Sequence, residues 1–183
     1  NGCRVAHYLR QNMPHYEYFR FTLKALKMWA KNKGVYSQIF CYLGGIGYTI
    51  LLAKVCQLYP NYGPLKLLER FFFLYSRWVW DVPVCLENIP IGEDKLGERP
   101  EMSVMTPVSP SMNAAHSVSQ STLRILRREF IEASRVIEKI HSQTKTWADL
   151  FAPSKFFEQH KSFLELSVMA KNPKDFTNWK GHI

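Results

Sequence analysis

The chain has 183 residues, of which 46% are hydrophobic and 21% charged, a balance that excludes an intrinsically disordered chain. Its formal net charge of +9 is uneven: residues 1–60 hold eight Lys or Arg against one acid, residues 61–118 hold five against seven, and residues 119–183 hold eleven against seven. The basic N-terminal third favours a polyanionic partner such as nucleic acid or nucleotide phosphates, with ordinary solubility charge as an equal alternative.

The first third of the chain predicts two helices. Residues 1–15 are expected to be irregular, because they begin with turn-forming residues and meet a stop at Pro14. A helix is predicted over 16–33, ended by Gly34, because apolar residues recur there at spacings of four, three and four. These residues are Phe19, Leu23, Leu26 and Ala30. A second helix is predicted over 44–59, between a pair of glycines and a proline.

The most apolar stretch of the chain, residues 39–53, is too short for a membrane span. It has 15 residues and three glycines, whereas a spanning helix needs about 20 apolar residues. A buried helix is therefore expected, and a third helix is predicted from residue 64 to about 80. Because the second half of this third helix is apolar nearly all round, it should lie deep in the domain.

A long connection with five prolines follows over residues 81–118, and connections of this length are often functional. A strong helical pattern returns over 120–143, and Thr146 and Asp149 have the spacing of a capping box. Near the end, apolar and polar residues alternate, which predicts a strand at about 161–170 with one face buried.

One face of the first predicted helix carries four cations. They are spaced four, three and four residues apart, so they lie within about 60° of each other around the helix axis. These residues are Arg20, Lys24, Lys27 and Lys31. Because like charges on one face repel, a bound anion could offset them; a solvated face is the favoured alternative on periodicity alone.

The glycine-rich turn before the second helix, Gly44 to Gly47, could bring backbone N–H groups close to a phosphate. No Gly-Lys-Ser/Thr follows, so this turn is not a P-loop, and glycines for tight helix packing are the more common explanation. No two of the four Asp residues are two positions apart, and the six His and four Cys residues show no catalytic or zinc spacing. The sequence therefore predicts no catalytic residue and no metal ligand, and it favours reduced thiols.

Seven ordered blocks of this sequence resemble eukaryotic nuclear poly(A) polymerases. The match is collinear and covers nearly the whole chain, apart from about 86–104. The blocks are NGCRV at 1–5, FRFTLKALKMWAKNKGVYSQIF at 19–40, YLGGIGYTILLAKVCQLYPN at 42–61, RFFFLYSRWVWDVPV at 70–84, MTPVSPSMNAAHSVSQST at 105–122, WADLF at 147–151 and FFEQHKSFLELSV at 156–168.

The resemblance implies a mainly α fold and a place within a three-domain enzyme. Residues 1–156 would form the central helical domain that grips ATP, and residues 157–183 would begin an incomplete RNA-binding domain of the RRM-like α+β type. The catalytic aspartates and their Mg²⁺ or Mn²⁺ ions would lie upstream, so the chain alone is expected to be inactive. The complete enzyme would add AMP from ATP to an RNA 3′ end in the nucleus, with cleavage and polyadenylation factors as partners.

The resemblance also implies contacts with ATP. Lys27 and Tyr36 match residues that reach the phosphates, and Lys suits a phosphate as a charged point donor. Gly45 and Ile46 match a Gly-Val pair in which the glycine permits close backbone approach and the branched residue presses on the adenine.

Further matches lie at Asn1, which would approach the ribose, and at Thr106 and Met112, which would recognise the adenine edge. Gln38 departs from the family, which has an asparagine near the base there; its longer side chain could make the same contact from a shifted backbone or point elsewhere. Structural roles for Tyr36, Thr106 and Met112, as a capping hydroxyl and loop packing, remain the alternative.

Two other functions stay open at this point. The chain could be a stand-alone RNA- or protein-binding helical module, or part of a terminal nucleotidyltransferase that uses another base, such as a uridylyltransferase. Incorporation of ATP compared with UTP would distinguish these possibilities.

Overall fold

The described residues form six α-helices, in line with the spacing of their apolar residues and the caps at helix ends. The computed structural model describes residues 2–87, 100–155 and 161–165, with residues 158, 167, 169 and 171–174 in addition. The elements are α1 (Gly2–Asn12), α2 (Tyr16–Asn32), a short 3₁₀ helix η1 (Gln38–Phe40), α3 (Gly45–Leu58), α4 (Pro64–Tyr75), α5 (Gln120–His141) and α6 (Trp147–Phe151).

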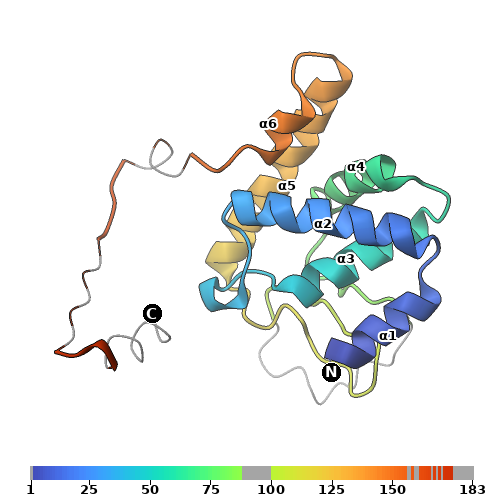
Figure 1. Cartoon of the computed structure of the whole chain (residues 1–183), viewed down its shortest axis with the longest axis horizontal. Coiled ribbons are helices and arrows are strands. Elements are labelled where there is room, and N and C mark those ends of the chain that lie inside the picture. The colour runs from blue at the N-terminus through green and yellow to red at the C-terminus, as the bar shows by residue number, and fades with distance from the viewer. Residues whose placement is uncertain are drawn as a thin grey trace.

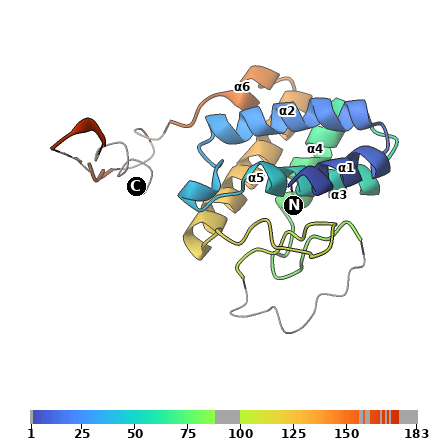
Figure 2. The ribbon, with the colours of Figure 1, turned by 60° about the horizontal axis from the view of Figure 1, so that its bottom comes forward.

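The helix α2 is at the centre of the packing. It contacts α3, α4 and α6, while α5 packs on α4 and α6 covers the end of α5 (Figure 1). The helix α1 lies beside α3 in both ribbon views (Figures 1 and 2), and its first residue, Gly2, lies near Ile46 in the first turn of α3. This arrangement brings the middle of α2 and the first turn of α3 to neighbouring positions.

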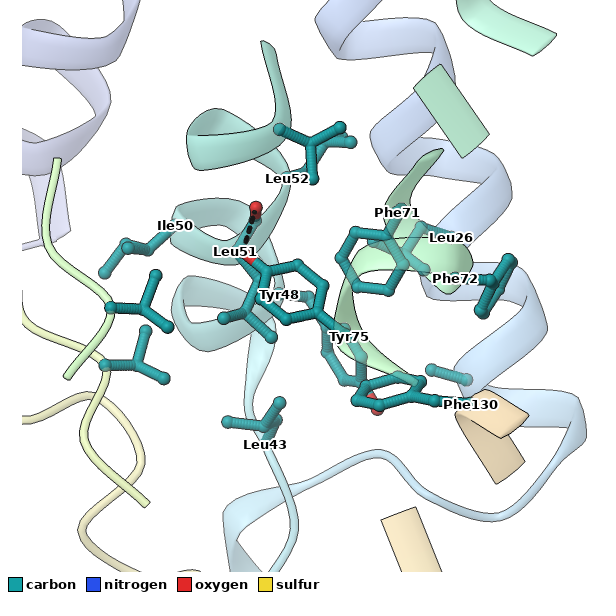
Figure 3. Packing of buried hydrophobic residues seen from close by; sticks show 14 of the residues in the cluster. Leu26, Leu43, Tyr48, Ile50, Leu51, Leu52, Phe71, Phe72, Tyr75 and Phe130 are labelled. Atoms are coloured by element: carbon teal, nitrogen blue, oxygen red, sulfur yellow. Dashed lines mark hydrogen bonds between the residues drawn. The ribbon is translucent and has the colours of Figure 1, made fainter. Parts of the chain in front are cut away.

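Aromatic side chains form the centre of the core. Phe130 of α5 is fully buried, and its ring lies within contact range of five other rings. These rings belong to Trp29, Phe71, Phe72, Tyr75 and Trp80. The Tyr75 hydroxyl donates a hydrogen bond of 2.8 Å to the Leu51 carbonyl of α3, so the polar end of this ring is satisfied within the core (Figure 3).

The described parts of the connection between α4 and α5 lie across the ends of the helices without forming a sheet. They make two isolated bridges, a parallel one between Val84 and Val104 and an antiparallel one between Met105 and Asn113. Figure 2 shows the segment that leads to α5 running below α1 and α3. The described parts of the predicted long connection thus lie against the helices, and Gln38 Nε2 donates to the Ala114 carbonyl of this segment.

The structure confirms the helices predicted over 16–33, 44–59 and 120–143 to within two residues at each end. Gly34 follows α2 with φ of 71°, the left-handed conformation that a terminating glycine adopts. The capping box is also present, with the Thr146 N–H donating to Asp149 Oδ2 at 2.7 Å. This bond is the main reason that the pKa of the Asp149 carboxyl is lowered.

Two predictions about the helices were wrong. Residues 2–12 form α1 instead of an irregular segment, because Val5 and Leu9, one helical turn apart, both bury against the core. The third predicted helix ends at Tyr75, about five residues early, since the chain turns there and Trp78 Nε1 donates to the Val82 carbonyl at 3.0 Å. As a result Val79 is 63% exposed instead of lying deep in the domain.

The strand expected at about 161–170 is not found among the described residues of that stretch. Residues 161–165, 167 and 169 have no regular hydrogen-bonded structure, and Leu164 is 86% exposed. A strand needs a neighbouring strand to pair with its backbone N–H and C=O groups, and the described helical part of the chain offers no sheet edge.

Within the described residues, no helix is long and apolar enough to cross a membrane.

Candidate functional site

The first turn of α3 presents backbone N–H groups at a surface rich in glycine. Gly44 precedes the helix in an extended conformation, and Tyr48 N–H is the first to find an acceptor within the turn, at the Gly44 carbonyl. The N–H groups of Gly45, Ile46 and Gly47 come before that point, where a helix has no carbonyl of its own to offer. They carry the positive end of the helix dipole, which favours an anion.

Two predicted site residues meet at Gly45. A Cβ atom placed on Gly45 would lie 3.0 Å from Tyr36 Oη, 3.5 Å from Lys27 Nζ and 3.7 Å from Lys27 Cε. The three residues come from the middle of α2, the loop after it and the start of α3. They are only partly buried, so the group lies open to a ligand.

The positive charge of Lys27 is poorly compensated. Burial, and secondarily the neighbouring charge of Lys31, lower the pKa of the Lys27 ammonium. No acid of the described residues lies within ion-pair distance of Lys24, Lys27 or Lys31, whereas Arg20 pairs with Glu17 at 3.3 Å. An anion beside Lys27 would therefore offset a charge that the described residues leave uncompensated.

Tyr36 is held in place by its neighbours. Its ring stacks on Tyr48 with centroids 5.9 Å apart and planes inclined by 8°, and Lys31 Nζ lies 5.4 Å from its centroid. The Tyr48 hydroxyl donates to the Val35 carbonyl at 2.7 Å, which fixes the ring below. Within the described residues the Tyr36 hydroxyl has no hydrogen-bond partner, so it is available to a ligand beside Gly45.

Ser37, between Tyr36 and Gln38, has an unusual backbone conformation that the sequence did not indicate. Its φ of 105° is a conformation that residues other than glycine rarely adopt. Three backbone hydrogen bonds hold it: its N–H donates to the Leu43 carbonyl, and its carbonyl accepts from Phe40 and Tyr42. Strained residues often flank functional sites, but a serine in a loop gives no sequence signal of such strain.

Gln38 connects the glycine turn to the long connection. A Cβ atom on Gly44 would lie 3.1 Å from Gln38 Cγ, and Gln38 Nε2 donates to the Ala114 carbonyl at 3.3 Å. The amide is thus engaged with the segment that also holds Met112. Ile46 is 41% exposed and lies near Gly2, where a Cβ atom would be 3.7 Å from Ile46 Cδ1.

Thr106 and Met112 lie in a loop that closes on itself. Thr106 is 5% exposed, and its hydroxyl accepts from the Met112 N–H at 2.9 Å. Its own N–H donates to the Met112 carbonyl, also at 2.9 Å, while the Met112 side chain is 56% exposed. The Thr106 hydroxyl therefore has a structural partner already, in agreement with loop packing.

Asn113 is a further residue that the sequence did not indicate. Its Oδ1 accepts from the N–H groups of Val104 and Ala115, and its Nδ2 donates to the Met102 carbonyl at 2.8 Å. Asn113 thus ties the connection together next to Met112.

Asn1 lies outside the described residues, so the structure does not describe its predicted contact with the ribose.

Among the described residues no group of three or more His, Cys, Asp or Glu side chains could hold a metal ion. The site therefore offers positive charge, backbone N–H groups and a tyrosine hydroxyl, and such a set can bind an anion.

Comparison with known protein families gives a match over most of the chain. The sequence model described as the poly(A) polymerase central domain matches residues 18–153. The chain is 40% identical to nuclear poly(A) polymerase 4 of Arabidopsis thaliana and 35% identical to a poly(A) polymerase of Dictyostelium discoideum. Both matches cover the whole of this chain. They cover only 26% and 24% of the two relatives, so the chain spans about a quarter of their length.

Solved structures agree on the fold. The structure of Cid1 with the UTP analogue UMPNPP superposes with a TM-score of 0.64 at 21% identity, over 75% of this chain and 57% of that one. A cytoplasmic RNA terminal U-transferase gives a TM-score of 0.59 at 21% identity, over 75% and 58%. At this identity the likeness establishes a shared helical architecture alone.

Proposed function

This chain belongs to the poly(A) polymerase family, and we propose that it is the central, ATP-gripping part of an RNA 3′-end adenylyltransferase. Its role is to bind the nucleotide while the reaction takes place on residues outside the chain. Both relatives named above are poly(A) polymerases, and one of them is named nuclear, which supports nuclear polyadenylation of pre-mRNA as the setting.

The observation that carries this proposal is the meeting of Lys27, Tyr36 and Gly45. The uncompensated ammonium of Lys27 neutralises phosphate charge, and the Tyr36 hydroxyl donates a hydrogen bond to a phosphate oxygen. Gly45 has no side chain, so the phosphates reach the N–H groups at the start of α3. Three different kinds of donor thus converge on one triphosphate, which positions it without covalent chemistry.

The base contacts are proposed from exposed side chains near this group. Ile46 forms an apolar wall for the adenine, and Met112 covers its edge from the long connection. The Thr106 hydroxyl accepts from the Met112 N–H, which holds the Met112 backbone, and its own O–H can donate to the adenine edge. Gln38 connects the two segments through Ala114, and Asn1 approaches the ribose.

The remaining parts of the reaction belong to other segments of the enzyme. The carboxylates that hold Mg²⁺ or Mn²⁺, which would neutralise the reacting phosphates, are placed outside this chain in the proposal, as the family resemblance implies. In this proposal residues 1–156 are the central domain, and residues 157–183 begin the RRM-like domain that binds RNA. Cleavage and polyadenylation factors are its protein partners.

Steady-state kinetics of the enzyme that carries this chain test the proposal. Lys27→Ala should lower kcat/KM for ATP. The decrease should correspond to a loss of about 1–3 kcal/mol of transition-state stabilisation, the range of a charge-assisted contact. Lys24→Ala is the matched control, because Lys24 is an exposed cation one turn away on the same face, and it should change ATP use little. Unchanged ATP dependence in Lys27→Ala, or equal loss in both variants, would remove the phosphate role of Lys27.

The same assay separates the alternative functions. ATP should be incorporated in preference to UTP; the reverse preference would indicate a uridylyltransferase. Binding of RNA without incorporation of any nucleotide would indicate a stand-alone binding module.

A further inference from the structure

Two adjoining hollows lie where the chain leaves α4 and meets the start of α5. The first has a volume of about 240 Å³ and is lined mainly by apolar residues. The second has a volume of about 450 Å³ and lies between residues 76–81, Glu101 and the first two turns of α5. They share Arg77, Trp78 and Val79, so they adjoin along this segment, and neither includes Lys27, Tyr36 or Gly45.

The first hollow exposes large apolar side chains. Phe73, Val79 and Val82 line it and are 43%, 63% and 52% exposed. Trp78 also lines it and is fixed by the bond from its Nε1 to the Val82 carbonyl. A concave apolar surface of this kind is a typical feature of protein interaction sites.

The second hollow contains three arginines from two segments. Arg77 lies over the Phe73 ring at 4.1 Å and donates to the Phe73 carbonyl at 3.2 Å, so its guanidinium is fixed. Arg124 donates to Gln120 Oε1 at 2.9 Å, and Arg127 lies one turn further along α5. No acid of the described residues is within ion-pair distance of any of the three, so their positive charges are not paired by the described residues and are available to a carboxylate.

Two acids, Asp81 and Glu101, line the same hollow as the arginines. A chain of consecutive phosphates, as in RNA, would meet repulsion from both carboxylates. A peptide can place a single acidic group at the arginines and pair its own N–H or basic groups with the two acids. The charge pattern therefore favours a peptide over a nucleic acid.

We propose that this pair of hollows is a docking groove for a short acidic and apolar segment of a partner protein. An apolar side chain of the segment enters the hollow at Phe73 and Val82, and a neighbouring Asp or Glu binds Arg124 and Arg127. The proposal goes beyond the nucleotide role and is independent of it, since the two sites share no residue.

A peptide array probed with the full chain tests the groove. The array carries 15-residue peptides in which Leu, Phe or Trp is followed by one Asp or Glu, with matched peptides in which Gln or Lys replaces the acid. The chain should prefer the acidic set, and Arg124→Glu/Arg127→Glu and Val79→Glu should each weaken binding of the best peptides by roughly tenfold or more. Arg135→Glu is the matched control, because Arg135 is an exposed arginine of α5 outside both hollows, and it should leave binding unchanged.

Thermal unfolding of each variant checks its fold, and Arg124→Gln/Arg127→Gln replaces the charge reversal if that variant unfolds. A lack of preference for acidic and apolar peptides, or equal binding by the groove variants, would overturn the proposal. Labelled oligoadenylate RNA is tested in parallel. If the arginine variants lose RNA binding and no peptide binds, the groove is a nucleic-acid surface instead.

Discussion

At the scale of single residues, the absence of a side chain at Gly45 is what allows Lys27 and Tyr36 to come together. Their side-chain ends occupy the space that a Cβ atom would contact. The Lys27 end is flexible, whereas the stacked Tyr36 ring can give way only slightly, and Gly45 is not in a left-handed conformation, so an added methyl group would displace both groups without breaking the fold.

Gly45→Ala should therefore lower ATP use while changing the free energy of unfolding by about 1 kcal/mol or less. The expected effect is roughly a tenfold rise in KM for ATP in the enzyme that carries this chain, because two phosphate donors are displaced. Gly63→Ala is the control, since Gly63 lies directly before α4, whereas Gly45 is the first residue of α3, and a Cβ atom on Gly63 would contact nothing within 4 Å. An unchanged KM in Gly45→Ala would show that close approach at this residue is not needed.

Ser37 allows a prediction about stability. Glycine adopts a φ of 105° without steric cost, so Ser37→Gly should raise the free energy of unfolding by about 0.5–2 kcal/mol, after the entropy cost of a glycine in the unfolded chain. Urea denaturation measures this change. Ser37→Ala keeps the strained conformation and should give no gain; a loss of stability in Ser37→Gly would contradict the role of strain.

The sequence led to part of the site only. Lys27 lies on a periodic cationic face and the glycine turn opens a helix, but each pattern alone favoured a structural explanation, and the resemblance singled out both as ATP contacts. The direct meeting of these two with Tyr36 follows from the packing of α2 on α3, which periodicity does not reveal. The predicted contact of Thr106 with the base rests on the resemblance alone, and the bond from the Met112 N–H to its hydroxyl crosses six residues of irregular chain, which leaves no spacing signal.

At the scale of elements, helices with strong periodicity and clear end signals were predicted well. The helix α2 has a regular apolar stripe and ends before a left-handed glycine, and α5 has both a stripe and a capping box. The helix α1 was missed because its short stripe competes with turn-forming residues at its start. The end of α4 was placed too late, because the apolar residues continue into a turn and hydrophobicity alone does not mark a helix end.

The start of α5 depends on its cap. Ser119 Oγ accepts from the Thr122 N–H, and Thr122 Oγ1 accepts from the Ser119 N–H at 3.0 Å. Ser119→Ala should lower the free energy of unfolding by about 1 kcal/mol, measured by urea denaturation. Ser121→Ala, at an exposed serine in the same turn, should change it by less than about 0.5 kcal/mol. Equal effects would mean that the cap does not stabilise α5.

At the scale of the whole molecule, an aromatic core holds the helices so that the candidate site lies open between α2 and the start of α3. Phe130 contacts rings from α2, α4 and the turn after α4, so it joins elements that are far apart in the sequence. An open, partly exposed site is the arrangement expected of a domain that meets its nucleotide at a surface and encloses it together with another part of the enzyme.

Phe130→Ala should lower the free energy of unfolding by about 3–5 kcal/mol, because it leaves a cavity among five rings. Phe21→Ala, at a side chain that is 68% exposed, should cost much less. Thermal or urea unfolding compares the two, and similar losses would show that Phe130 is not the centre of the core.

The most direct test of the nucleotide site is a titration of the isotopically labelled chain with ATP, followed by amide resonances. The Gly45, Ile46 and Gly47 signals should shift first and most strongly, because their N–H groups would donate to the phosphates, and Lys27→Ala should suppress these shifts while Lys24→Ala keeps them. Shifts confined to other surfaces, or equal shifts in the Lys27→Ala variant, would contradict binding of a triphosphate at the start of α3.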